Sequence, residues 1–265
     1  MTTSSKYAVI TGASRGLGRC FAIELSKKGM NTILVGMPGE NLKELSEELI
    51  ERYRVSSVFF ETDLTVKDNV LQFTDWANDQ YNIHVLINNA GVGGTRQFID
   101  ADVNYIDNII QLNVMATTLI TRQLLPNLMK QTEAYILNVS SMAAFSPIGY
   151  KTVYPASKVF IHYFSRSLNA ELANTNVFVS VVNPGPMKTN ADVTQRINRQ
   201  GILGRLGLLS PEKVAEISVR RLFKKDSMIM LNLTNGISWL LMKIVPVWIR
   251  LPILTKAVKR ELNLG

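Results

Sequence analysis

The sequence of 265 residues predicts an α/β fold, in which helices cover both faces of a parallel sheet. Short, continuous apolar runs recur along the chain, and such runs are typical of strands that are buried on both faces. Each run precedes a longer segment with helical character. This repeated alternation is what parallel strands with crossover helices require, so we expect one sheet in one domain.

Four apolar runs fall in the first half of the chain, and a helical pattern follows each of them. The first helical pattern ends at Gly29, and the second, NLKELSEELIERY, is amphipathic and heavily charged. The fourth is the longest and contains Asn113. We expect strands at 7–12, 31–36, 56–63 and 84–91, and helices at 15–29, 41–53, 67–80 and 104–130.

Three further apolar runs and two helical patterns follow in the second half. Pro211 opens the last helical pattern, at the position where a helix tolerates proline best. No linker, repeat or low-complexity tract divides the chain, so we expect one domain over residues 1–235 and a C-terminal amphipathic extension over 236–265. The strands expected here are 134–141, 176–185 and 228–233, and the helices are 157–173 and 211–225.

The few cysteines and histidines exclude several kinds of site. Cys20 is the single cysteine, so no internal disulfide can form, which fits a reducing compartment. His84 and His162 are the two histidines, and no Cys/His cluster has metal-ligand spacing. We therefore expect no metal site.

No segment of the sequence predicts secretion or a membrane span. The N-terminus, MTTSSKYAVITG, has no long apolar stretch behind a basic region, so we expect no signal peptide. The nearest candidate for a span, residues 237–249, falls short of the roughly 18 apolar residues that a span needs and contains Lys243 and Pro246. We expect a cytoplasmic protein, with any membrane association confined to its surface.

The net charge of +8 is concentrated at the C-terminal end. Residues 213–265 hold 10 Lys and Arg residues against 3 Asp and Glu residues, whereas residues 1–212 are nearly balanced. A basic segment indicates nucleic acid or an anionic membrane surface as a partner. Because this segment is also rich in Leu, Ile, Val and Trp, it favours a membrane surface or an acidic ligand, and we expect no nucleic-acid binding.

A glycine-rich loop, TGASRGLG, joins the first predicted strand to the first helix. Backbone amides at a helix N-terminus favour a phosphate group, and glycines let that group approach closely. Gly12, Gly16 and Gly18 do not have the G-x-G-x-x-G spacing of the usual dinucleotide fingerprint. Their position between a strand and a helix predicts a phosphate site, and the alternative is a plain turn.

The end of the second strand bears on which dinucleotide binds. A site that prefers NAD normally places an acidic side chain there for the ribose 2′-hydroxyl, and Val35-Gly36-Met37 offers none. Arg15, inside the glycine loop, would suit a 2′-phosphate. This favours NADP(H) over NAD(H), with a solvated Arg15 as the alternative. Asp63, after the third strand, would meet the adenine amino group or cap the next helix.

The stretch YPASK places Tyr154 and Lys158 four residues apart at the start of a predicted helix. Positions i and i+4 lie on the same helix face, so the ammonium group and the phenol would be neighbours. A nearby cation favours the phenolate, so we expect a lowered Tyr154 pKa and a proton donor tuned toward working pH. The alternative is an ordinary pair on a helix surface.

Three more motifs complete an ordered set: NNAG, Asn113, and the pair Ser140-Ser141. With TGASRGLG, YPASK and NPGPMKT (183–189), they resemble the short-chain dehydrogenase/reductase family over residues 6–233. The resemblance implies a doubly wound, Rossmann-like sheet in a dinucleotide-binding catalytic domain. It places the chain near the steroid and long-chain 3-oxoacyl reductase members.

The resemblance implies a role for four residues. Tyr154 is similar to the catalytic acid/base, and Lys158 resembles the lysine that lowers the tyrosine pKa and binds the nicotinamide ribose. The family's serine lies thirteen residues before its tyrosine, which selects Ser141 over Ser140 as the donor to the substrate carbonyl oxygen. Asn113 resembles the asparagine whose backbone holds a water in the proton relay.

The same resemblance implies the reaction and further cofactor contacts, while NADP(H) is expected as the preferred cofactor because of Arg15 and the missing acid. Hydride passes between the nicotinamide and an apolar ketone or secondary alcohol of steroid or long-chain 3-oxoacyl type. A nucleotide-sensing binding protein without turnover is the alternative, and the joint presence of all four implied catalytic residues argues against it. The implied contacts are Gly12, Ser14, Arg15, Gly16, Leu17, Gly18, Asp63, Leu64, Asn89, Ala90, Gly91, Tyr154, Lys158, Pro184, Gly185, Met187 and Thr189.

Residues 190–210 bear on the choice of substrate. They follow the implied nicotinamide contacts and have no strong period, and in this fold such a segment is usually a mobile lid. Their leucines predict an apolar wall beside the substrate, with ordinary packing as the alternative. These leucines are Leu203, Leu206, Leu208 and Leu209.

Two further features bear on macromolecular partners. The family resemblance implies a homodimer or homotetramer built from the helices at 104–130 and 157–173. The tail at 238–262 intersperses Trp and aliphatic residues with Lys and Arg, which is typical of an amphipathic helix at a membrane interface. Docking of this tail on the sheet edge or on a partner subunit is the alternative.

Overall fold

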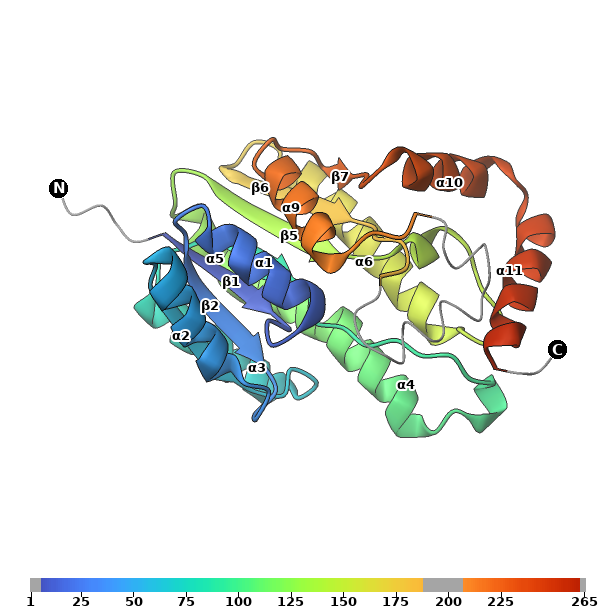
Figure 1. Cartoon of the computed structure of the whole chain (residues 1–265), viewed down its shortest axis with the longest axis horizontal. Coiled ribbons are helices and arrows are strands. Elements are labelled where there is room, and N and C mark those ends of the chain that lie inside the picture. The colour runs from blue at the N-terminus through green and yellow to red at the C-terminus, as the bar shows by residue number, and fades with distance from the viewer. Residues whose placement is uncertain (1–5, 188–206, 263–265) are drawn as a thin grey trace.

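Seven parallel strands form one sheet through the centre of the molecule (Figure 1). The structure, a computed structural model, describes residues 6–187 and 207–262. Across the sheet the strand order is β3-β2-β1-β4-β5-β6-β7, and every neighbouring pair is parallel. The strands are β1 (Tyr7–Thr11), β2 (Asn31–Gly36), β3 (Ser57–Glu61), β4 (Ile83–Asn88), β5 (Ala134–Val139), β6 (Val177–Val182) and β7 (Met228–Ile229).

Helices cover both faces of this sheet, which confirms the predicted α/β, doubly wound fold (Figure 1). The covering helices are α1 (Gly16–Ser26), α2 (Leu42–Tyr53), α3 (Lys67–Gln80), α5 (Thr117–Met129), α6 (Val153–Glu171) and α9 (Pro211–Leu222). On one face, α1, α2 and α9 bury a core layer that includes Phe21 and Leu45. On the other face, α3 and α5 bury a second layer that includes Phe73 and Leu124.

The strand order reverses between β1 and β4, which lie side by side although two strands and three helices separate them in the sequence. In doubly wound sheets, ligands bind outside the carboxyl ends of the strands at such a point. The glycine loop follows β1, and the NNAG motif begins at Asn88, the last residue of β4. Because all strands are parallel, the segments that follow β5 and β6 meet the same edge of the sheet.

The long helix predicted at 104–130 consists of three successive helical pieces. These are α4 (Val103–Ile110), the π-helical turn η2 (Gln111–Ala116) and α5. The π turn contains Asn113, and such widened turns occur frequently at functional sites. The extent of the helix is confirmed, but its change of pitch at Asn113 is not visible in the sequence pattern.

Two predicted boundaries were wrong in the C-terminal half. The run predicted as a strand at 228–233 pairs with the sheet only at Met228–Ile229, because Asn232 caps a helix that starts at Leu233. The Asn232 side chain accepts a hydrogen bond of 2.8 Å from the Asn235 amide. Helix α6 begins at Val153 and not at 157, so the whole of YPASK is helical.

The C-terminal extension consists of two helices, α10 (Leu233–Ile244) and α11 (Val247–Glu261). Pro246 stands between them, and α10 starts three residues before the predicted boundary at 236. Two short 3₁₀ turns, η1 (Phe98–Asp100) and η3 (Met142–Phe145), complete the described elements. None of the helices in the described ranges is both long enough and apolar enough to cross a membrane.

Candidate active site

A cavity of about 450 Å³ lies at the carboxyl edge of the sheet and brings Ser141, Tyr154 and Lys158 together. Ser141 comes from the turn after β5, and the other two come from the first turns of α6. The other residues that line the cavity are Asn89, Gly91, Val92, Gly93, Gly94, Met142, Ala143, Ser146, Ile148, Lys151, Pro184, Gly185, Pro186, Met187, Met242 and Leu254.

Lys158 is a buried cation with one defined partner. Its side chain is 6% exposed, and its Nζ donates a hydrogen bond of 3.0 Å to the carbonyl oxygen of Val139, the last residue of β5. Burial lowers the pKa of the Lys158 ammonium group to about 8. Removal from water disfavours the charged form, so the ammonium is held close to the point of losing its proton.

Tyr154 behaves differently from the sequence-based expectation. Its ring centroid lies 5.9 Å from the Lys158 Nζ, so the two side chains are neighbours as predicted. However, burial raises the pKa of the Tyr154 phenol, and a hydrogen bond with the Ser141 hydroxyl only opposes this rise. The expectation of a lowered tyrosine pKa was therefore wrong for the protein without nucleotide, because desolvation outweighs the neighbouring groups.

The two adjacent serines have separate tasks. The Ser140 hydroxyl is buried and donates a hydrogen bond of 2.7 Å to the Lys158 carbonyl oxygen, which ties β5 to α6. The Ser141 hydroxyl lines the cavity and accepts a hydrogen bond of 3.1 Å from the Ala143 amide. Of the pair, Ser141 is thus the serine that can reach a substrate, in agreement with the choice made from spacing.

Asn113 fixes the loop after β4 against α6. Its Oδ1 accepts a hydrogen bond of 2.9 Å from the Val92 amide, and its Nδ2 donates to the Val92 carbonyl oxygen and to the Ser157 hydroxyl, each at 2.9 Å. A Cβ atom on Gly91 would lie 3.0 Å from Asn113 Oδ1 and 3.3 Å from Lys158 Nζ. A side chain at residue 91 would therefore crowd both groups, and glycine lets the loop pass this close without displacing them.

The glycine loop forms a cradle at the start of α1. Gly12 and Gly16 have positive φ angles of 64° and 56°, and a Cβ atom on Gly18 would lie 1.9 Å from the Gly12 carbonyl oxygen. No side chain caps the helix, and its first turn holds no acidic residue. The amides of that turn are thus available to a phosphate group, so the loop fits the pyrophosphate of a dinucleotide.

Glu40 is a site residue that the sequence did not single out. Its Oε1 lies 3.4 Å from the Arg15 guanidinium, and its Oε2 accepts a hydrogen bond of 2.6 Å from the Ser14 hydroxyl. The β2–α2 turn makes this contact by folding back, with Gly39 at a φ of 78°. Arg15 is therefore largely exposed and paired with an acid beside the glycine loop, a contact that the sequence did not indicate.

The remaining predicted cofactor contacts are either apolar side chains buried in the core or polar side chains that already hold turns of the backbone. Leu17 and Leu64 are buried in the two core layers, so only their backbone atoms could meet a ligand. Asp63 accepts hydrogen bonds from the amide and the hydroxyl of Thr65, at 2.9 and 2.7 Å, which stabilise the turn before α3. Asn89 donates to the Thr11 and Gly12 carbonyl oxygens, and so links the β4 end to the glycine loop.

The segment after β6 is described only in part. Pro184, Gly185 and Met187, which are expected from the sequence to contact the nicotinamide, line the cavity that also contains Ser141. Ala90 packs against the core layer below the cavity. Thr189 lies outside the described residues, as do Leu203 and Leu206.

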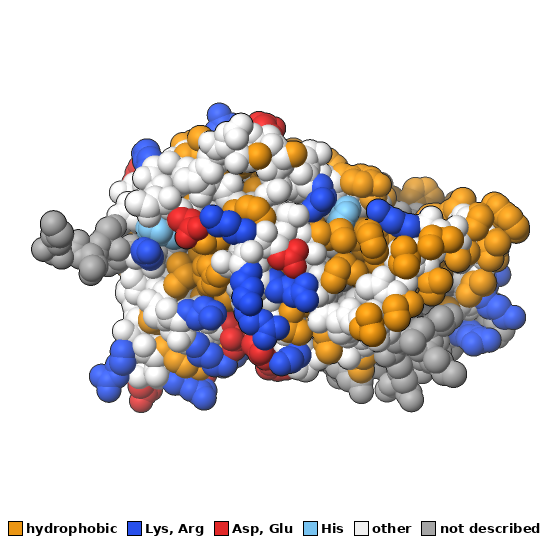
Figure 2. All heavy atoms as spheres, turned by 90° about the horizontal axis from the view of Figure 1, so that it is seen from above, with side chains coloured by type: hydrophobic (Ala, Val, Ile, Leu, Met, Phe, Trp, Pro, Cys, Tyr) orange, Lys and Arg blue, Asp and Glu red, His pale blue; other side chains and the backbone are white. Residues whose placement is uncertain are grey.

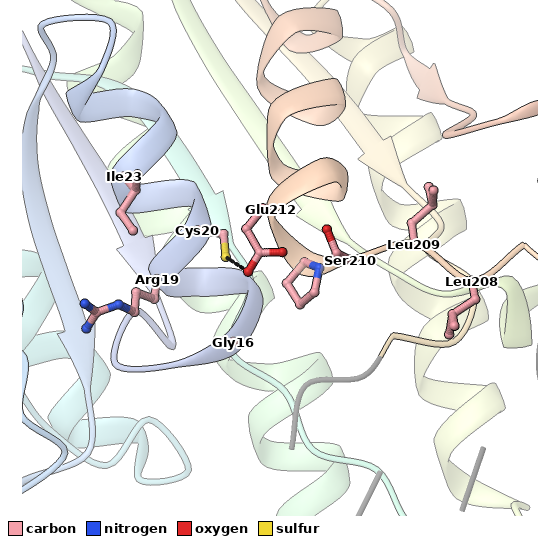
Figure 3. A pocket seen from close by; sticks show the side chains of 9 residues that line it. Gly16, Arg19, Cys20, Ile23, Leu208, Leu209, Ser210 and Glu212 are labelled. Carbon is pink, nitrogen blue, oxygen red and sulfur yellow. Dashed lines mark hydrogen bonds between the residues drawn. The ribbon is translucent and has the colours of Figure 1, made fainter. Parts of the chain in front are cut away.

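A second pocket, of about 520 Å³, lies between α1 and the start of α9 (Figure 3). Leu208 and Leu209 line this pocket and not the cavity of Tyr154, so for these two leucines the predicted substrate wall was wrong. The Cys20 thiol donates to Glu212 Oε1 across the pocket at 3.9 Å. Burial, together with the Glu212 carboxylate, raises the pKa of Cys20 to about 11.

This raised pKa predicts an unreactive thiol. At pH 8, native Cys20 should react with a disulfide reagent about 100-fold more slowly than in urea, because the thiolate is the reactive form. The rate is followed by the colour of the released thiol, with Cys20→Ser as the blank. Equal rates in the folded and unfolded protein would show that the Cys20 thiol is not buried and that its pKa is not raised.

Metal chemistry has no obvious place in the described part of the chain. Among residues 6–187 and 207–262, no group of three or more His, Cys, Asp and Glu side chains is arranged to hold a metal ion. The polar side chains that line the cavity include a hydroxyl, a phenol and an ammonium group, from Ser141, Tyr154 and Lys158, and the others are Asn89, Ser146 and Lys151. Such a set can polarise a carbonyl oxygen and pass a proton to it.

Comparison with known proteins agrees with this geometry. A family model described as short chain dehydrogenase matches residues 6–200. A 3-oxoacyl-acyl-carrier-protein reductase from Aquifex aeolicus is 31% identical over 219 residues, which are 80% of this chain and 88% of the relative. A very-long-chain 3-oxoacyl-CoA reductase from Anas platyrhynchos is 35% identical over 182 residues, 67% of this chain but only 58% of the relative.

A solved structure extends the likeness to three dimensions. L-sorbose reductase from Gluconobacter frateurii, in complex with NADPH and L-sorbose, superposes with a TM-score of 0.74 at 26% identity. The match covers 83% of this chain and 90% of the other. The range matched by the family model, residues 6–200, includes the glycine loop, the NNAG motif and YPASK.

Proposed function

The chain belongs to the short-chain dehydrogenase/reductase family, and we propose that it interconverts an apolar ketone and the corresponding secondary alcohol with NADP(H) as cofactor. The observation that carries this proposal is the convergence of Ser141, Tyr154 and Lys158 on one cavity. That cavity lies beside a phosphate cradle at the point where the strand order reverses.

The residues present fit a nicotinamide dinucleotide. The uncapped first turn of α1 and the glycines before it suit the pyrophosphate, while Asn89, Gly91 and Met187 border the cavity where the nicotinamide would lie. When bound, the cofactor supplies or accepts the hydride. The protein supplies the placement of the substrate and the movement of the proton.

The three polar side chains suit the developing charge on a substrate oxygen. As a ketone is reduced, negative charge grows on its oxygen, and hydrogen bonds donated by Ser141 and Tyr154 stabilise that charge. Tyr154 then gives its phenolic proton to the oxygen, and the raised pKa ensures that the phenol holds this proton at neutral pH. Lys158 places a positive charge beside the phenolate that remains.

The lining of the cavity supports an apolar substrate. Away from the three polar groups its wall is largely aliphatic, and it includes side chains from both C-terminal helices. Two of the similar proteins act on 3-oxoacyl thioesters by name. We therefore propose a long-chain 3-oxoacyl or steroid-like ketone. The aliphatic lining residues include Val92, Met142, Ala143, Ile148, Met187, Met242 and Leu254.

The preference for NADP(H) depends on Arg15 and is limited by Glu40. A 2′-phosphate would have to draw Arg15 away from the Glu40 carboxylate, which also repels the phosphate. Arg15→Gln should weaken NADPH binding by about 10-fold and leave NADH binding nearly unchanged, since a charged hydrogen bond is lost. Glu40→Gln should strengthen NADPH binding. Both are measured by nicotinamide fluorescence at fixed salt.

Arg52→Gln is the matched control for this titration, because Arg52 is an exposed arginine with its own glutamate partner on α2. It should change the affinity of neither nucleotide. Tighter binding of NADH than of NADPH by the unmodified protein would contradict the proposed preference. An Arg15→Gln variant that binds NADPH normally would contradict the role of Arg15.

We place the protein in the cytoplasm as a homodimer or homotetramer. Its single cysteine is a free thiol, in keeping with a reducing compartment. Apolar side chains stay exposed on the two helices that would form the subunit interface: Met115, Phe160 and Tyr163 are 41%, 42% and 66% exposed. Met115 lies in η2 and the other two lie on α6, so an interface between copies of the η2–α5 segment and of α6 would cover them.

A further inference from the structure

Helix α10 carries its apolar stripe on the outside. Its exposed aliphatic residues follow the spacing i, i+4, i+7, i+8 and i+11, so they lie along one side of the helix. In a helix that only packs on its own domain this stripe would face the core. These residues are Leu233, Ile237, Leu240, Leu241 and Ile244, with exposed fractions of 80%, 51%, 49%, 53% and 68%.

The first half of α11 continues this apolar surface. Trp248, whose exposed fraction is 72%, is the largest side chain in it. Figure 2 shows hydrophobic side chains gathered over the end of the molecule where α10 and α11 lie. We call this surface the α10–α11 face. Its members on α11 are Val247, Trp248, Ile249 and Ile253.

The opposite side of α11 is fastened to the domain. Ala257 and Val258 are buried, and the Thr255 hydroxyl accepts a hydrogen bond of 3.1 Å from the Gly149 amide. Arg250 donates to the Phe145 carbonyl oxygen at 2.7 Å. The helix therefore cannot turn its apolar side inward without breaking these contacts, and the α10–α11 face stays presented to the surroundings.

The charges around this face select the kind of partner. Residues 233–262 hold five Lys and Arg residues and a single acid, Glu261. Lys243, Lys256 and Arg260 are exposed. Two copies of this face brought together would oppose like charges, whereas an anionic lipid surface attracts the cations while its acyl region accepts Trp and aliphatic side chains.

We propose that the α10–α11 face docks on an anionic membrane surface. The same two helices contribute Met242 and Leu254 to the cavity of Tyr154. Docking would hold that cavity close to the lipid, where an apolar ketone of the proposed kind accumulates. The link to substrate delivery rests on the proposed function, whereas docking itself depends only on the two helices.

Sedimentation with vesicles tests the docking without nucleotide or substrate, so a failure of the proposed reductase activity would not affect the result. The full chain should bind vesicles made of phosphatidylcholine and phosphatidylserine. It should bind much more weakly to vesicles of pure phosphatidylcholine. Neutralising Lys243, Lys256 and Arg260 together to Gln should weaken binding by about 100-fold, since each cation near the surface adds a similar increment. A higher salt concentration should also weaken binding to the anionic vesicles, because salt screens the attraction between the cations and the lipid charges.

Apolar contact is tested by Ile244→Asp, with Ile50→Asp as the matched control. Ile50 is 45% exposed on the charged helix α2, away from the α10–α11 face. Ile244→Asp should lose vesicle binding and keep NADPH binding, which reports an intact fold, whereas Ile50→Asp should bind vesicles normally. Absence of vesicle binding by the full chain would overturn the proposal. So would concentration-dependent self-association that Ile244→Asp abolishes, since a second copy would then be the occupant.

Discussion

Replacing Tyr154 by Phe should reduce turnover by about 10²- to 10⁴-fold, the usual contribution of a positioned proton donor. The variant loses one oxygen atom from a half-buried ring and keeps the packing of that ring against Gly93. Affinity for NADPH should stay within about threefold, because no phosphate contact is removed. Turnover is measured from the absorbance of reduced nicotinamide, and affinity from its fluorescence.

Tyr163→Phe is the matched control for this prediction. Tyr163 lies on the same helix, α6, but is 66% exposed, so loss of its hydroxyl should leave turnover unchanged. A Tyr154→Phe variant with normal turnover would remove Tyr154 from the proposed mechanism. Equal losses of turnover and of NADPH affinity would instead indicate a damaged fold.

Replacing Lys158 by Met should separate activity from stability. Turnover should fall strongly, because the cation beside Tyr154 is lost. The free energy of unfolding of the nucleotide-free protein at pH 7 should rise, by up to about 3 kcal/mol, because burial penalises the Lys158 charge. Lys130→Met, at an exposed lysine, should change neither quantity.

The pH dependence of stability follows from the same group. The Lys158 pKa is about 8 in the folded protein and 10.5 when unperturbed, so between these values the unfolded chain binds more protons. Stability should therefore rise as pH increases from about 8 toward 9, and this rise should be absent in Lys158→Met. The measurement is kept below about pH 9, because the raised pKa of Cys20 acts in the opposite direction above that value, and the raised Tyr154 pKa adds to it at higher pH. An unchanged pH profile in the variant would contradict the buried charge.

Local patterns were sufficient to predict most of the fold. Each continuous apolar run before Val182 is a strand of the sheet, because a strand buried on both faces needs apolar side chains at successive positions. The pattern failed at 228–233, where a short apolar run suits a strand or the start of a helix. Asn232 decides between them by capping α10, a contact that appears only once the helix is placed.

The site could be predicted where a motif fixes its geometry and not where burial or loop shape decides. YPASK places Tyr154 beside Lys158 through helix spacing alone. The direction of the Tyr154 pKa shift depends on how deeply the fold buries the phenol, which the sequence does not report. Glu40 escaped notice because its contact with Arg15 requires the turn at Gly39.

The C-terminal tail is a second case in which the sequence does not report which side chains become buried. The sequence shows Trp, aliphatic and basic residues mixed over 238–262, but not which of them face outward. The two helices resolve this, because one side of α11 is buried at Ala257 and Val258 while Trp248 and Ile253 remain exposed. The sequence alone therefore could not show whether the tail packs on its own domain or presents its apolar side to a partner. The placement of α10 and α11 on the domain was needed.

The central claim, that this chain passes a hydride between nicotinamide and a carbonyl carbon, is tested most directly with a deuterium label. Purified protein is given NADPH deuterated on the nicotinamide ring together with apolar ketones, among them a 3-oxoacyl thioester and a ketosteroid, and the products are analysed by mass spectrometry. We expect an alcohol with deuterium on its carbinol carbon, and at least about 100-fold less of it in the same time with Tyr154→Phe. Tight NADPH binding without labelled alcohol from any ketone would contradict the claim and indicate a nucleotide-binding protein without turnover.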